Sequence, residues 1–184
     1  MSANQITVIG WVVGIAGCFS FLWGSYWTGI VGCILIVICK LLDYVDGGMA
    51  RITGTDSKFG HLLDSTVDFT LSGLLPLSIG FGLFLETGIW VYLLLGGIYA
   101  FSKILGYLVS HGYDLAFQNN LKEVADENRL ASWGVRLSLL DVPILLICAI
   151  TNTLHIFLIL FTLLFVSKAI GTITVALIKG GVGK

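Results

Sequence analysis

The sequence predicts an all-α integral membrane protein, a six-transmembrane-helix bundle with both termini in the cytoplasm. The 184-residue chain is 57% hydrophobic and only 11% charged, which leaves too little polar surface for a soluble globule of this size. Its mean hydropathy is +0.96, and the apolar residues form runs near the ~20 residues that a helix needs to cross the hydrocarbon. No ten-residue alternating strands are visible, which disfavours a membrane barrel.

Turn residues and charges divide the apolar sequence into six expected spans, at 6–23, 27–42, 62–85, 89–111, 133–150 and 153–178. The first run is not expected to be a removable signal peptide, because no basic segment precedes it and equally apolar runs follow. No internal repeat of roughly 20 to 50 residues is visible. Residues 1–184 are therefore expected to form a single membrane domain.

Lysine and arginine predict the orientation. They gather in residues 40–58, 113–136 and 179–184, whereas the connections near 23–26, 86–88 and 151–152 contain none. Cytoplasmic segments carry the excess of basic residues, so both termini and the two charged loops are expected in the cytoplasm. A basic stripe suited to nucleic acid is absent from the sequence.

Acidic residues are concentrated in one segment. Five of the eleven lie between Leu41 and Thr70. Asp43 and Asp46 are spaced i, i+3, and Asp64 and Asp68 are spaced i, i+4, so each pair shares one helical face. A helix that descends through the first pair, turns near Gly54 and returns through the second would bring four carboxylates face to face. Two like charges about 4 Å apart repel by about 4 kcal/mol at an effective dielectric near 20, so the cluster must protonate, stay hydrated or hold cations.

The types of residue in this segment suggest what it binds. Oxygen ligands without cysteine favour Mg²⁺, Mn²⁺ or Ca²⁺ over zinc, and such ions complete their shells with water and phosphate oxygens. Gly47 and Ala50 allow a ligand to approach the helix backbone, and Arg51 is a forked phosphate donor. The residues predict a metal-dependent site for a phosphorylated substrate. The alternative, a solvated loop with salt bridges, is disfavoured because Asp64 and Asp68 enter an apolar span.

The acid-rich segment resembles the complete signature of the CDP-alcohol phosphatidyltransferases, with Asp43-x-x-Asp46-Gly47-x-x-Ala50-Arg51, eight residues, and then Gly60-x-x-x-Asp64-x-x-x-Asp68. The six-span topology and the cytoplasmic motif are also similar to that family. The resemblance implies that an acceptor hydroxyl attacks the β-phosphate of a CDP-linked lipid alcohol, forms a phosphodiester and releases CMP, as in phospholipid biosynthesis.

The resemblance also implies roles for particular residues. Asp43, Asp46, Asp64 and Asp68 are expected to hold Mg²⁺ or Mn²⁺, two ions in all, and Asp68 is the expected general base. The expected CDP site comprises Asp43, Gly47, Ala50, Arg51 and Gly60. Two metals would clamp the diphosphate and offset the charge of the leaving group, while the protein supplies positioning. The expected setting is a homodimer in a prokaryotic cell membrane, with a CDP-lipid donor, a small polar alcohol acceptor and membrane lipids as partners.

The segment before the first span adds two candidates. Ala3-Asn4-Gln5-Ile6-Thr7 is similar to the Pro-Asn-x-x-Thr that often precedes this span in the family, with Ala3 in place of the proline. Asn4 and Thr7 are therefore expected at the CDP site. The alternative for Asn4 is a helix N-cap.

The acceptor alcohol stays open between two branches of the family. The run from Ser57 through Asp68 is similar to serine users, whereas Met49-Ala50-Arg51 with Phe59-Gly60 is similar to the inositol-phosphate branch. Phe69 stands where that second branch often has arginine.

Three cations are expected to bind the acceptor: Lys103, Arg136 and Lys168. All three lie in the cytoplasmic half of later spans, where converging charges would suit an acceptor that carries a phosphate. The alternative is that the lysines snorkel to the interface.

Two other functions remain open from the sequence. One is the same chemistry with a soluble CDP-alcohol donor. The other is a divalent cation channel or transporter, which would place acids or broken helices near the membrane midplane. The acids instead gather at one face, which favours the transferase.

Overall fold

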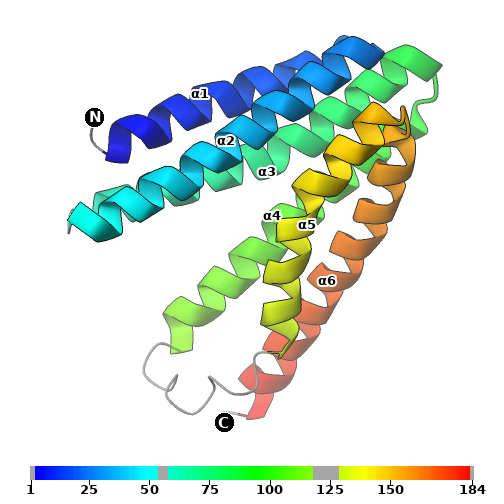
Figure 1. Cartoon of the computed structure of the whole chain (residues 1–184). Coiled ribbons are helices and arrows are strands. Elements are labelled where there is room, and N and C mark those ends of the chain that lie inside the picture. The colour runs from blue at the N-terminus through cyan, green and yellow to red at the C-terminus, as the bar shows by residue number, and fades with distance from the viewer. Residues whose placement is uncertain (1–2, 54–57, 118–128, 183–184) are drawn as a thin grey trace.

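The computed structural model describes residues 3–53, 58–117 and 129–182, which form helices joined by short turns. The helices are α1 Ala3–Phe21, α2 Tyr26–Thr53, α3 Lys58–Thr87, α4 Val91–Phe117, α5 Arg129–Ile150 and α6 Leu154–Val182 (Figure 1). No strand occurs in these described ranges. The prediction of an all-helical architecture is therefore confirmed.

Five of the helices contain a stretch long and apolar enough to cross a membrane: Asn4–Phe21, Tyr26–Met49, Leu62–Thr87, Val91–Val109 and Leu154–Thr174. In α5 the described apolar stretch, Leu140–Ile150, is shorter. Large apolar side chains on these helices, such as Val12, Val31 and Leu163, are 51–65% exposed. A surface of this kind suits lipid, because helices satisfy their own backbone hydrogen bonds within hydrocarbon. The chain is thus a multi-pass membrane protein, and the sixth span stays a prediction.

The helices run further than the predicted spans at their charged ends. α2 continues to Thr53 and α3 begins at Lys58, so all four aspartates lie within continuous helix. Gly47 and Gly48, which lie beyond the predicted end of the second span at residue 42, are also inside α2. A helix that leaves the hydrocarbon keeps its backbone groups paired, and this outweighs the helix-breaking tendency of glycine, about 1 kcal/mol per residue.

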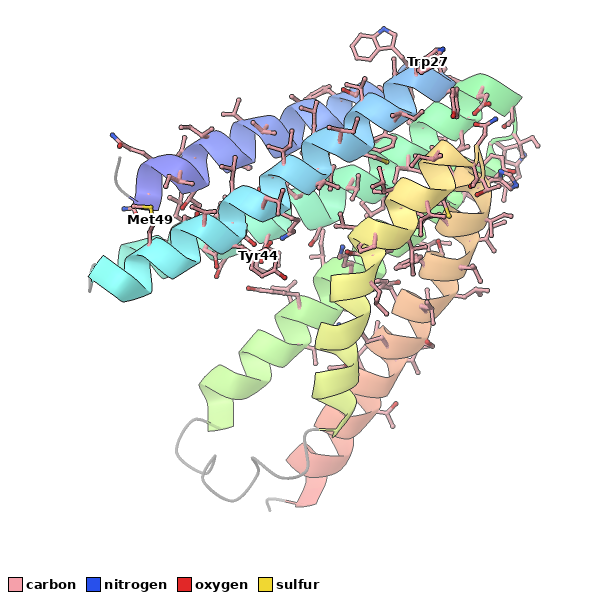
Figure 2. The ribbon with its side chains drawn as sticks, in the orientation of Figure 1. Trp27, Tyr44 and Met49 are labelled. Atoms are coloured by element: carbon pink, nitrogen blue, oxygen red, sulfur yellow. The ribbon has the colours of Figure 1, made fainter. Side chains whose placement is uncertain are left out.

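The helices form two groups of three, α1–α3 and α4–α6, which meet at one end and diverge toward the other (Figure 1). The short connections α1–α2, α3–α4 and α5–α6 all lie at the end where the groups meet. Each of these turns contains one residue of positive φ, Gly24 at 57°, Gly88 at 72° and Asn152 at 55°, a conformation that these residue types tolerate. Trp27 projects outward from the same end (Figure 2) and is 74% exposed.

The two groups are joined by contacts of α3 with α4 and α6, and of α2 with α5. An aromatic column on α6 fills the interior of the second group. Phe157 stacks on Phe161 with ring centroids 4.3 Å apart, and Tyr99 of α4 lies 5.1 Å from the ring centroid of Phe165. All four rings are buried, so the second group has a rigid core.

Helices α3 and α4 approach most closely at a pair of glycines. A Cβ added at Gly80 would lie 2.5 Å from the carbonyl oxygen of Tyr92 and 3.1 Å from the Cα of Gly96. Small residues at such crossings let helix backbones touch in a membrane. This contact holds α4 against α3.

Gly96→Ala should destabilise the protein by about 1–3 kcal/mol. Its new methyl group would lie 2.7 Å from the carbonyl oxygen of Pro76 and 3.2 Å from the Cα of Gly80, so α3 and α4 must separate. The control is Gly97→Ala on the same helix, where an added Cβ meets nothing within 4 Å. Thermal unfolding in detergent measures both, and an equal loss of stability in the two variants would contradict the close approach.

Candidate active site

The first three helices lie side by side (Figure 1) and bring the predicted aspartates together. Asp43 and Asp46 lie on α2, and Asp64 and Asp68 lie on α3. The carboxyl group of Asp64 contacts that of Asp43 and lies within electrostatic reach of Asp68 and Asp46. Four acidic groups from two helix ends therefore form one cluster, which we call the aspartate cluster.

Lys40, which the sequence places in a basic segment expected in the cytoplasm, lies inside this cluster. The Nζ of Lys40 is 2.9 Å from Oδ1 of Asp68 on α3 and 3.5 Å from Oδ2 of Asp43 on α2. The side chains of the three residues are between 31% and 40% exposed. Lys40 precedes Asp43 by three residues and so shares its helical face, a spacing that could have identified it.

Helix α1 contributes Thr7. The Thr7 hydroxyl donates a hydrogen bond of 2.5 Å to Oδ2 of Asp46, whose residue is only 6% exposed. Met49, at the far end of α2, lies beside the beginning of α1 (Figure 2), which shows how these two helix ends meet. Thr7 thus positions a carboxylate of the cluster. Asn4 is exposed within the first turn of α1, so the N-cap interpretation finds no support.

The remaining signature positions are partly described. A Cβ built at Gly47 meets nothing within 4 Å, so open space lies beside the backbone there, and Gly60 is half-buried at the beginning of α3. The expected turn at Gly54 and the side chains of Ala50, Arg51 and Arg136 lie outside the described residues.

The chemistry of the aspartate cluster fits a hard divalent cation. Its candidate ligands are carboxylate oxygens, the type that Mg²⁺ and Mn²⁺ prefer. The ammonium of Lys40 shows that a cation is accommodated between Asp43 and Asp68. As the described side chains lie, no three from His, Cys, Asp and Glu surround one point closely enough to enclose an ion. To form a closed coordination shell, carboxylate side chains of the cluster would have to rotate toward the ion.

A second group of charges lies in α4, α5 and α6. Lys103 forms an ion pair with Asp141 at 3.0 Å, and the two side chains are only 17% and 11% exposed. Lys103 and Lys168 approach the ring of Phe165, with Nζ 5.3 Å and 5.4 Å from its centroid. The structure therefore brings together two of the three cations predicted for the acceptor, with Asp141 as a counter-ion.

Comparison with known families agrees with this arrangement. The family model for CDP-alcohol phosphatidyltransferases matches residues 1–178, so the chain belongs to the CDP-alcohol phosphatidyltransferase family. The resemblance carried by the aspartate spacing is thereby confirmed.

The chain is similar to relatives in both branches that the sequence left open. It is 37% identical over 68 residues to an archaetidylinositol phosphate synthase of Pyrococcus horikoshii, covering 37% of this chain and 35% of the relative. It is 37% identical over 65 residues to a CDP-diacylglycerol–serine O-phosphatidyltransferase of Helicobacter pylori, covering 35% and 27%. A phosphatidylinositol phosphate synthase of Streptomyces avermitilis is 34% identical over 79 residues, covering 40% and 29%. The match spans about a third of the length of these curated relatives.

Thr7→Val should lower stability by about 1.5–3 kcal/mol, the contribution of a hydrogen bond to a charged group. Valine keeps the shape of threonine but leaves the buried Asp46 carboxylate without the Thr7 hydroxyl. Thr7→Ser keeps the hydroxyl and should retain most of the stability. Chemical unfolding in detergent measures both variants; if valine and serine behave alike, the hydroxyl does not support Asp46.

Proposed function

We propose that this chain transfers a phosphatidyl or ether-lipid phosphatidyl group from a CDP-linked lipid alcohol to the hydroxyl of a small polar alcohol, releasing CMP. The observation that carries the proposal is the aspartate cluster, in which α2 and α3 hold four carboxylates at the spacing of the family signature. Family membership over residues 1–178 supports the same reaction. No observation on the described residues favours a channel.

The residues of the cluster have separate tasks in this reaction. Asp43, Asp46, Asp64 and Asp68 would hold two divalent ions, Mg²⁺ or Mn²⁺, which when bound neutralise the diphosphate and the CMP leaving group. An oxygen of Asp68 that no metal ion holds accepts the proton of the acceptor hydroxyl. Thr7 holds Asp46 in place. The open backbone at Gly47 gives room for the nucleotide beside Ala50, Arg51 and Gly60.

The position of the cluster supports the donor and the orientation that we propose. The four acids lie toward the ends of α2 and α3 that are remote from the three short, uncharged connections (Figure 1). Basic residues favour the cytoplasm, which supports an active site that faces the cytoplasm, with both termini on the same side. The similar proteins of Pyrococcus, Helicobacter and Streptomyces support a prokaryotic cell membrane. A site at the ends of apolar helices favours a lipid-linked donor over a soluble one. We also propose that the enzyme works as a homodimer.

The acceptor is proposed to carry a phosphate, as an inositol phosphate does. The support is the convergence of Lys103 and Lys168 on Phe165, to which Arg136 is added from the sequence. Among the described side chains, these two partly buried ammonium groups lie near one carboxylate, that of Asp141, which leaves a net positive charge that an anionic acceptor would neutralise. Serine lacks a phosphate, so it would leave this charge unbalanced.

Purified protein should release CMP from CDP-diacylglycerol or its ether analogue only when a divalent metal and an acceptor are present. Asp68→Asn should lower the rate at least about 100-fold, because general bases contribute 10²–10⁴-fold. Glu86→Gln, at the opposite end of α3, should not change it. A panel of unlabelled alcohols, scored by CMP release, identifies the acceptor. CMP release without any metal, or near-normal activity of Asp68→Asn, would contradict the proposal.

Lys103→Ala should raise the KM for a phosphorylated acceptor roughly tenfold or more, as expected for loss of a charge-assisted contact. The KM for the CDP-lipid should stay nearly unchanged. The matched variant is Asp141→Asn, which breaks the same ion pair but keeps the cation. It should not raise the acceptor KM. If the two substrates respond equally to Lys103→Ala, this lysine does not belong to the acceptor site.

A further inference from the structure

Lys40 is a cation built into the aspartate cluster by the chain itself. Its ammonium touches one carboxylate from each of the two helices that form the cluster, at 2.9 Å from Asp68 and 3.5 Å from Asp43. It is attached one helical turn before Asp43, on the side of the cluster nearer the membrane interior. The ammonium therefore lies in the gap between α2 and α3 where the carboxylates would otherwise repel each other.

A divalent ion held by the same carboxylates would compete with this ammonium. Both need the oxygens of Asp43 and Asp68, and their like charges repel at such short range. A monovalent ion carries the same charge as the ammonium, which is already attached to α2 and so has the advantage of high effective concentration. A divalent ion carries twice that charge and is attracted more strongly by the cluster.

The Lys40 side chain is partly open to its surroundings. It is 38% exposed and lines a small pocket together with Thr7, Asp43 and Asp46. Lysine carries its charge on a flexible four-carbon stem, so the ammonium can withdraw from the gap without movement of α2.

We propose that Lys40 is a tethered counter-ion, which occupies the gap between Asp43 and Asp68 and withdraws when a divalent ion binds. In this role it keeps the four carboxylates together in the metal-free enzyme, excludes monovalent ions and sets the concentration of divalent metal that the enzyme needs. The inference rests on the proposed function only in taking the aspartate cluster as the metal site.

The first test is Mn²⁺ binding to the purified full-length protein, followed by calorimetry or by the electron paramagnetic resonance of free Mn²⁺, without nucleotide or lipid. Lys40→Met removes the charge but keeps the length of the side chain. It should bind Mn²⁺ roughly two- to fivefold more tightly, as expected when a partly exposed competing ion pair is lost. Added NaCl should weaken Mn²⁺ binding to Lys40→Met more than to the wild type.

Two controls accompany this test. Lys40→Arg keeps a cation at the position and should stay within about twofold of the wild type, since it preserves the charge. Lys168→Met removes a half-buried lysine from α6, which carries none of the four aspartates, and should leave Mn²⁺ affinity unchanged. Unchanged or weaker Mn²⁺ binding by Lys40→Met, or no Mn²⁺ binding by any variant, would overturn the inference.

The second test uses the wild-type protein and does not depend on the folding of a variant. Acylation by acetic anhydride is slow while an ammonium is held in an ion pair, so saturating Mn²⁺ should speed the acylation of Lys40 severalfold, as measured by peptide mass spectrometry. Lys168 is the internal reference and should not respond. Slower or unchanged labelling of Lys40 would also overturn the inference.

The two proposals fail separately. Tighter Mn²⁺ binding by Lys40→Met together with no CMP release by the wild type would retain the counter-ion and reject the transferase. Normal metal-dependent CMP release with identical Mn²⁺ affinities would retain the transferase and reject the counter-ion.

Discussion

Repulsion among the four carboxylates of α2 and α3 is the constraint on which the rest of the structure depends. Close packing of apolar groups just inside the membrane holds them together: a Cβ added at Gly14 of α1 would lie 2.9 Å from both Cys39 and Leu71. Cys39 immediately precedes Lys40, and Leu71 lies about one turn beyond Asp68 on α3. The tight α1–α2–α3 contact thus forces like charges together, and the Lys40 ammonium reduces the resulting electrostatic cost.

The two ends of the bundle serve different purposes. Where the helix groups meet, short turns and glycine contacts such as Gly80 with Gly96 fix the backbones against each other. At the other end the groups diverge (Figure 1), and the four aspartates lie in the parts of α2 and α3 that extend toward it. Helices joined firmly at one end therefore present the aspartate cluster toward the other, which suits the CDP-lipid site that we propose.

The ion pair of Lys103 with Asp141 is the counterpart of the Lys40 contacts in the second helix group. It joins α4 to α5 at 3.0 Å beside the aromatic column of α6. A buried ion pair is not a strong source of stability, but leaving either partner alone is costly. Asp141 therefore offsets part of the positive charge that Lys103 and Lys168 bring together in the second helix group.

The sequence by itself determined the helical class, the order of the helices and the clustering of four aspartates, because apolar length and i, i+3 or i, i+4 spacing are local properties of the chain. It could not determine which polar groups meet across helices. Thr7 with Asp46, Lys40 with Asp68 and Lys103 with Asp141 join residues 39, 28 and 38 positions apart, and nothing in the local pattern specifies such pairs. The rotation and crossing of packed helices decided these contacts, because they depend on which surfaces fit together in three dimensions.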